Sequence, residues 1–171
     1  MDFTEVINTR RSHRKFADEK VPEDVLKRIL EAACLAPTWS NKQGVRYIVV
    51  DDPEQLKKLG EAGQKWIVGA PMVIVAFIKA KDSGVNTNGL EYFPVDAAIC
   101  LHQLILAATN EGLGTCWIGF FDEEKTKQIL KLPEKARVIG MTPLGYSRYT
   151  PREIERQSIE KTVYRNEYSK K

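Results

Sequence analysis

The apolar run APMVIVAFIKA, residues 70–80, constrains the fold more than any other part of this chain. It is apolar at nearly every position and rich in β-branched residues, which predicts a strand covered on both faces rather than on one. A second apolar stretch, VDAAICLHQLILAA at residues 95–108, is apolar nearly all round a helix. Such a helix is either fully buried or lies at a subunit interface. The chain therefore predicts a central sheet with helices packed against it.

Flanking segments alternate between helical and extended patterns. In VPEDVLKRILEAACLAP, residues 21–37, apolar side chains recur at helical spacing, acidic residues favour its start, and Pro37 lies just past its end. The remaining predicted helices cover residues 2–12, 53–62, 95–110 and 122–133. The remaining predicted strands share short apolar runs, and they cover residues 46–52, 115–121 and 137–147. This mixture favours α+β or α/β in one domain of 171 residues, whose charged tail from Arg148 must lie over something, such as a second subunit.

Composition excludes several classes of protein. The net charge is +3, from 26 basic and 23 acidic residues, which is too balanced for a general nucleic-acid binder. Cys34, Cys100 and Cys116 form no C-x-x-C pair, so we expect small buried hydrophobic side chains in a reducing compartment, not a disulfide framework or a zinc site. Two distant histidines give no metal-ligand spacing. With no basic and apolar leader and no apolar run of about 20 residues, we expect a cytoplasmic protein without a membrane span.

One basic cluster stands apart from this balance. The segment NTRRSHRKFADEK, residues 8–20, places Arg10, Arg11, Arg14 and Lys15 within six positions. Like charges repel, and burying one is costly unless it is paired. The cluster is therefore either a solvated surface or a site for an anion, and its composition alone leaves both readings open.

Four motifs in fixed order carry a family resemblance. They are RRS-x-R-x-F, APTWSNKQ, GLGTCWIGFF and PLGYS. From about Phe3 to Tyr168 the chain closely resembles the nitroreductase-like flavoproteins. The resemblance implies an α+β, three-layer fold with a central, mostly antiparallel sheet flanked by helices. It also implies an intertwined homodimer with two FMN sites at the subunit interface, in which each chain is one FMN-binding domain, 1–171, whose tail, about 150–171, extends over the partner.

The same resemblance assigns the cofactor contacts. The arginine-rich segment would grip the FMN phosphate through Arg10 and the N1–O2 edge of the flavin through Arg14, since guanidinium groups match phosphate oxygens bidentately. The loop at 37–43 would come from the partner subunit, and main-chain amides around Ile118 and Gly119 would approach flavin N5. The full expected set of FMN contacts is Arg10, Arg11, Ser12, Arg14, Pro37, Thr38, Trp39, Asn41, Gln43, Gln64, Cys116, Trp117, Ile118, Gly119 and Arg156.

For several side chains near these motifs, we expect a structural role or leave two roles open. His13 is expected at the surface, and His102 is expected as a satisfied core or interface histidine. Cys116 is expected to be a buried, inert thiol. Trp39 either stacks near the flavin ring or fills the interface. The residues Tyr92 and Phe93 either close over the flavin or anchor the long helix.

The resemblance implies an FMN-dependent NAD(P)H oxidoreductase with ping-pong hydride transfer to nitroaromatic, quinone or similar small acceptors. No protein residue is expected to be catalytic, because the flavin supplies the chemistry. The absence of a Rossmann G-x-G-x-x-G, a P-loop or a Ser-His-Asp set agrees with this. A second hypothesis is an FMN storage or sensor protein with little turnover. A nucleic-acid or phosphoprotein binder is disfavoured by the balanced charge.

Overall fold

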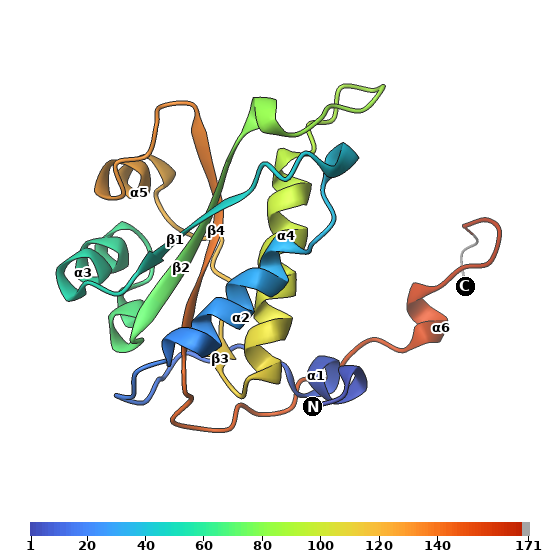
Figure 1. Ribbon diagram of the computed structural model, residues 1–171. Coiled ribbons are helices and arrows are strands. Elements are labelled where there is room, and N and C mark those ends of the chain that lie inside the picture. Colours follow the sequence, from blue (N-terminus) through green and yellow to red (C-terminus); the bar gives the residue numbers. More distant parts are fainter. Residues whose placement is uncertain (169–171) are drawn as a thin grey trace.

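The apolar run forms β2 (Met72–Lys79), which lies inside a four-stranded antiparallel sheet of order β1-β2-β4-β3. Its neighbours are β1 (Arg46–Val50) and β4 (Ala136–Gly145), and the short β3 (Gly114–Thr115) pairs with the end of β4. The computed structural model describes residues 1–168, which form a sheet with helices on both faces (Figure 1). The α+β, three-layer prediction is confirmed.

Helices of two groups cover the two faces of the sheet (Figure 1). On one face lie α2 (Glu23–Cys34) and the long α4 (Phe93–Asn110), with α1 (Phe3–Thr9) at the far end of α4. On the other face lie α3 (Pro53–Ala62) and α5 (Glu123–Ile129). The remaining helical segments are short, and they are η1 (Trp39–Asn41), η2 (Lys65–Gly69), η3 (Ala80–Asp82) and α6 (Ile159–Thr162).

Each face of β2 contributes to its own hydrophobic core. Ile74 and Ile78 pack in the cluster that includes α2 and α4, whereas Val73 and Val75 pack in the cluster that includes α3. All four side chains are 0% exposed. Successive side chains of a strand point to opposite faces. The run is apolar at nearly every position because both of its faces are buried, as predicted.

Acidic side chains start three of the helices. Asp2, Asp52 and Asp122 each accept a hydrogen bond from a backbone amide three residues further on, at 2.9, 2.9 and 3.0 Å. These contacts satisfy amides that have no partner inside the helix. The first helix has a complete capping box, because Glu5 also accepts from the Asp2 amide.

One side of α4 is uncovered within the single chain. Val95 and Ile99 are 38% and 40% exposed, and His102 on the same side is also exposed. The fully buried reading of this helix is therefore wrong, and so is the expectation of His102 as a core residue. That this side of α4, with His102, lies at a subunit interface stays a prediction. No helix among the described residues is long and apolar enough to cross a membrane.

Two other expectations are corrected. The stretch 115–121 is not a continuous strand, because only Gly114–Thr115 pairs with β4 before the chain turns away, touching it again through Ile118 and Met141. Cys34 is exposed, while Cys100 and Cys116 are buried as expected. The buried side of α2 contains Leu26, Ile29 and Ala33, and one further residue rotates Cys34 about 100° away from that side.

Candidate functional site

The arginine-rich segment is an extended strip beside the sheet. After α1, Ser12 bridges to Thr115 of β3, and the His13 amide donates to the Thr115 carbonyl at 2.7 Å. Phe16, 3% exposed, bridges to Ser147 just after β4. Because side chains alternate along an extended chain, neighbouring arginines point to opposite sides of this strip.

On one side of the strip is a pocket of about 180 Å³. It combines a guanidinium, a side-chain amide, three aromatic rings and a stretch of main chain. The lining residues are Arg14, Gln64, Trp66, Cys116, Trp117, Ile118, Gly119 and Phe120. The fold thus brings together six of the residues expected to bind the cofactor, from three separate parts of the sequence. It adds Trp66 and Phe120, for which the only sequence signal is an aromatic residue beside an expected contact.

The Gln64 amide is held in one orientation at this pocket. Its Oε1 accepts from Trp66 Nε1 at 3.0 Å, and its Nε2 lies 3.5 Å from the Phe120 carbonyl. Lys65, the weaker alternative to Gln64 in the sequence, is exposed. The indole therefore fixes which end of the amide faces a bound molecule.

The main chain along the pocket presents one unused amide of the two expected. The Ile118 amide donates to the Met141 carbonyl at 2.9 Å, so it is not available to a ligand, which corrects the expectation for Ile118. For the Gly119 amide no acceptor is found among residues 1–168. A Cβ added at Gly119 would meet only Trp117 Nε1, at 3.5 Å. Open space beside Gly119 leaves its amide accessible to a bound molecule.

Arg10 has an unusual electrostatic environment for a surface arginine. Burial, and next the positive charges of Arg156 and Arg11, hold the pKa of the Arg10 guanidinium below its ordinary value. No ion pair under 4.0 Å within residues 1–168 involves Arg10. Along the extended strip, Arg10 falls on the same side as Arg14, which lines the 180 Å³ pocket. Arg10 and Arg156 are therefore unneutralised cations that an anion would stabilise.

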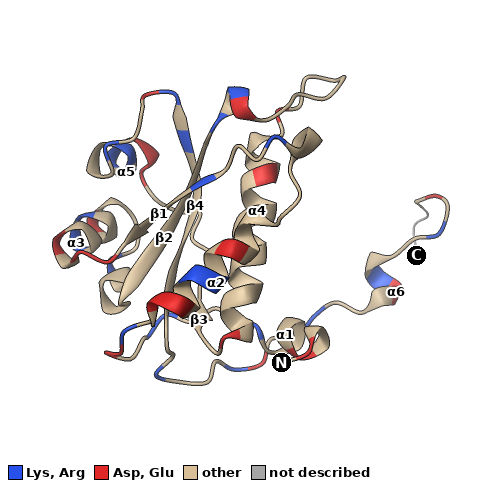
Figure 2. Cartoon of the chain, viewed as in Figure 1, with Lys and Arg blue, Asp and Glu red and all other residues tan. Residues whose placement is uncertain are grey.

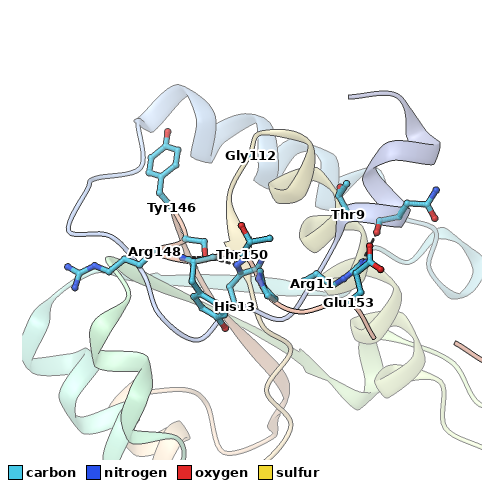
Figure 3. Close-up of a pocket in the computed structure, with 12 residues that line it drawn as sticks. Thr9, Arg11, His13, Gly112, Tyr146, Arg148, Thr150 and Glu153 are labelled. Carbon is cyan, nitrogen blue, oxygen red and sulfur yellow. Dashed lines mark hydrogen bonds between the residues drawn. The ribbon is translucent and has the colours of Figure 1, made fainter. Parts of the chain in front are cut away.

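The opposite side of the strip faces a larger cleft of about 650 Å³, shown in Figure 3. Arg11 lies in this cleft, and its Nη1 donates to the Asn8 and Arg10 carbonyls at 2.6 and 3.0 Å. His13 is half-buried there, and its Nδ1 lies 2.7 Å from Ser147 Oγ. The expectation of His13 as a surface residue is therefore wrong, because the strip packs against the end of β4.

The loop at 37–43 lies elsewhere in the chain. Figure 1 places η1 near the Phe93 end of α4, whereas α1 and the start of the arginine strip lie near the Asn110 end. Its Thr38 Oγ1 accepts from the Gln43 amide at 2.9 Å, which closes the loop on itself. Within one chain, the expected contacts of this loop are not brought to the 180 Å³ pocket. These residues are Pro37, Thr38, Trp39, Asn41 and Gln43.

The structure also shows what Trp39 of this loop and Phe93 at the start of α4 contact within the chain. The Trp39 ring packs on the Tyr92 ring, with centroids 4.6 Å apart. Phe93 is 4% exposed in the core, with the Arg137 guanidinium 5.4 Å from its ring centroid, so it anchors the long helix rather than closing over a site.

Among the described residues, no group of three or more His, Cys, Asp or Glu side chains could hold a metal ion.

Comparison with known proteins identifies the class to which this fold and pocket belong. The model of the nitroreductase family matches residues 7–67 and 60–146. The chain is 36% identical over 158 residues to the FMN reductase (NAD(P)H) of Bacillus subtilis, covering 82% of this chain and 64% of that protein. It is 31% identical over 169 residues to the NADH dehydrogenase of Thermus thermophilus, covering 80% of this chain and 82% of that protein.

A solved structure agrees with these relatives. The FMN-dependent nitroreductase of Clostridium difficile R20291 superposes with a TM-score of 0.81 at 28% identity, covering 97% of this chain and 100% of that one. The chain belongs to the nitroreductase family.

Proposed function

We propose that this chain is an FMN-dependent NAD(P)H oxidoreductase, which passes hydride by a ping-pong route to nitroaromatic, quinone or similar small acceptors. The observation that carries the proposal is the pocket joining Arg14, Gln64 and the Gly119 amide beside the unneutralised Arg10. Relatives named as an FMN reductase and an FMN-dependent nitroreductase support the choice of cofactor.

The residues present fit a phosphorylated flavin. A flavin phosphate carries nearly two negative charges, and Arg10 and Arg156 are neighbouring cations with unfavourable mutual repulsion. Binding the phosphate between them replaces that repulsion with charge-assisted hydrogen bonds. Ser12, on the same strip, supplies a hydroxyl donor. This cluster therefore favours the anion site over the solvated surface as the role of the basic segment.

Bound FMN supplies a ring position, N5, that accepts and donates hydride. The residues of the chain hold and tune that ring. The Gly119 amide donates a hydrogen bond in a fixed direction without any ionisable side chain. Arg14 places a positive charge at the ring edge where negative charge develops. The rings of Trp66, Trp117 and Phe120 line the same pocket and offer apolar surface to a bound ring.

The site is completed by a second copy of the chain in this proposal. Each copy is one FMN-binding domain, 1–171, and the loop at 37–43 of one copy would reach the pocket of the other. Two exposed apolar surfaces support an interface between the two copies. The apolar stripe of α4 at Val95 and Ile99 is uncovered, and in the tail Ile159 and Val163 are 67% and 56% exposed. Residues 169–171 lie outside the described part of the tail.

Absorption spectroscopy of the purified protein tests this function. We expect visible flavin absorption that is retained after gel filtration at the mass of a dimer, and that bleaches within seconds of anaerobic NADH or NADPH addition. Bleaching followed by recovery on adding a quinone would support the ping-pong route. Flavin that neither donor bleaches would instead favour the storage or sensor hypothesis. A colourless protein that FMN cannot reconstitute would refute both.

A further inference from the structure

Asp96 is the one Asp, Glu, Lys or Arg residue in the whole of α4, and it is buried at 2% exposure. Figure 2 shows this helix as otherwise free of charged residues, with the acidic band near its Phe93 end. A buried carboxylate is costly unless it is well hydrogen-bonded. Its presence in an apolar helix therefore requires a structural or functional reason.

The carboxylate holds two separate loops at once. Its Oδ1 accepts from the Trp39 amide at 2.8 Å, and its Oδ2 accepts from Ser83 Oγ at 2.6 Å. Trp39 belongs to the loop at 37–43, and Ser83 belongs to the loop after β2. Asp96 also lies in the first turn of α4, where the helix dipole favours a negative charge. Asp96 thus fixes both loops to the end of one rigid helix.

The loop held at Trp39 is strained. Ser40, Asn41 and Gln43 have φ of 46°, 55° and 52°, a left-handed region that residues with a side chain rarely adopt. Three such residues within four positions persist only when the surroundings over-determine the conformation. The Thr38 hydroxyl closes the loop by accepting from the Gln43 amide, and the bond to Asp96 attaches it to the fold. Strain of this kind is found at ligand clamps, where it pre-organises the contacts.

The second loop packs against the first around the same carboxylate. A Cβ added at Gly84 would lie 2.1 Å from Trp39 Nε1, so the indole rests directly on the Gly84 main chain. The Tyr92 amide donates to the Gly84 carbonyl at 2.8 Å, and the Tyr92 ring packs against the same indole, with centroids 4.6 Å apart. Lys42 Nζ donates to the Ser83 carbonyl. These contacts join the two loops, so a shift of one loop requires a shift of the other.

We infer that Asp96 is a positioning residue for the cofactor site: its carboxylate holds the strained loop at 37–43 in the conformation that contacts FMN. This inference rests on the proposed function, in which Thr38, Asn41 and Gln43 of that loop contact FMN across the dimer. Asp96 itself touches no ligand. It acts because its two carboxylate oxygens accept from the Trp39 amide and from the Ser83 hydroxyl at the same time.

The test compares Asp96→Ala, Asp96→Asn and Ser83→Ala with the unchanged protein. Asp96→Ala removes both bonds and should weaken FMN binding about 30-fold, whereas Asp96→Asn keeps one acceptor and should weaken it about fivefold. Ser83→Ala leaves the Trp39 bond in place and should change binding by less than about threefold. In Asp96→Ala apoprotein, the amides of the segment 37–44 should exchange hydrogen faster than in the unchanged apoprotein. At saturating FMN, its visible circular dichroism should also change.

A matched control separates positioning from general loss of stability. Thr126 is a buried polar residue, 0% exposed, on α5 across the sheet, and its Oγ1 donates to the Asp122 carbonyl at 2.8 Å. Thr126→Val should lower the melting temperature and leave FMN affinity and flavin dichroism unchanged. Asp96 variants that bind FMN as tightly as the unchanged protein, or a Thr126→Val variant that loses as much affinity, would overturn the inference. An unchanged protein that binds no FMN would instead refute the proposed function.

Discussion

Arg10 and Arg11 are adjacent in the sequence but face different surroundings, so replacing each with alanine should have different effects on FMN binding. Arg10 lies among other cations beside the proposed flavin pocket, without an acidic partner within the described chain. Arg11 lies in the larger cleft of Figure 3, where its Nη1 already donates to two backbone carbonyls. The alternation of an extended strip predicts that only one of them contacts the phosphate directly.

The size of the effect follows from the kind of bond lost. A hydrogen bond to a charged group contributes about 1.5–3 kcal/mol, and every 1.4 kcal/mol is about tenfold in affinity. Arg10→Ala should therefore weaken FMN binding about 10- to 150-fold, and Arg11→Ala less than about threefold. Since Arg10 is repelled by Arg156 and Arg11 in the apoprotein, its removal should not lower the apoprotein's melting temperature.

Quenching of FMN fluorescence on titration with apoprotein measures both affinities. Repeating it at several salt concentrations adds a second readout, because binding should depend on salt less steeply in Arg10→Ala than in the unchanged protein. Equal losses of FMN affinity in the two variants, or a larger loss in Arg11→Ala, would refute the assignment of Arg10 to the pocket side of the strip and of Arg11 to the cleft side. The expectation from the sequence that Arg11 also contacts FMN would then hold.

Two further predictions concern stability. Gly44→Ala should destabilise by about 1–3 kcal/mol in urea unfolding, because its Cβ would lie 2.3 Å from the Asp82 carbonyl oxygen, whereas Gly69→Ala meets nothing within 4 Å and should have little effect. Burial, and next the charge of Arg10, lower the pKa of His13 from 6.5, so below that pH the unfolded chain binds a proton that the native state resists. The free energy of unfolding should therefore fall as the pH drops from 6.5 toward the lower native pKa, and His13→Gln should make this fall smaller; an unchanged pH profile would contradict the assigned environment.

The local sequence was sufficient for most of the elements. The uniform apolar run at 70–80 predicts a strand covered on both faces, and Val73 and Ile74 are buried on opposite sides of the sheet. The helical repeat and acidic start at 21–37 predict α2. The stretch at 115–121 is apolar enough for a strand, but its pairing depends on the reach of β4, which the local pattern does not contain.

The candidate site was predicted less completely, because its geometry depends on distant partners. The motifs identify Arg14, Gln64 and Gly119 as site residues, and the fold brings them to one pocket. The motifs do not show that the Ile118 amide is already bonded to Met141. That bond joins residues far apart in the sequence, and no local spacing reveals it.

The sequence by itself determined most of the elements, the family and the presence of a basic segment, because these depend on local composition and order. Only the tertiary structure decided which side of that segment each arginine faces, since this depends on how the strip pairs with β3. It alone also joined Asp96 to Trp39, 57 positions away in the chain. A hydrogen bond between distant residues depends on packing, which brings the ends of separate elements within about 3 Å of each other.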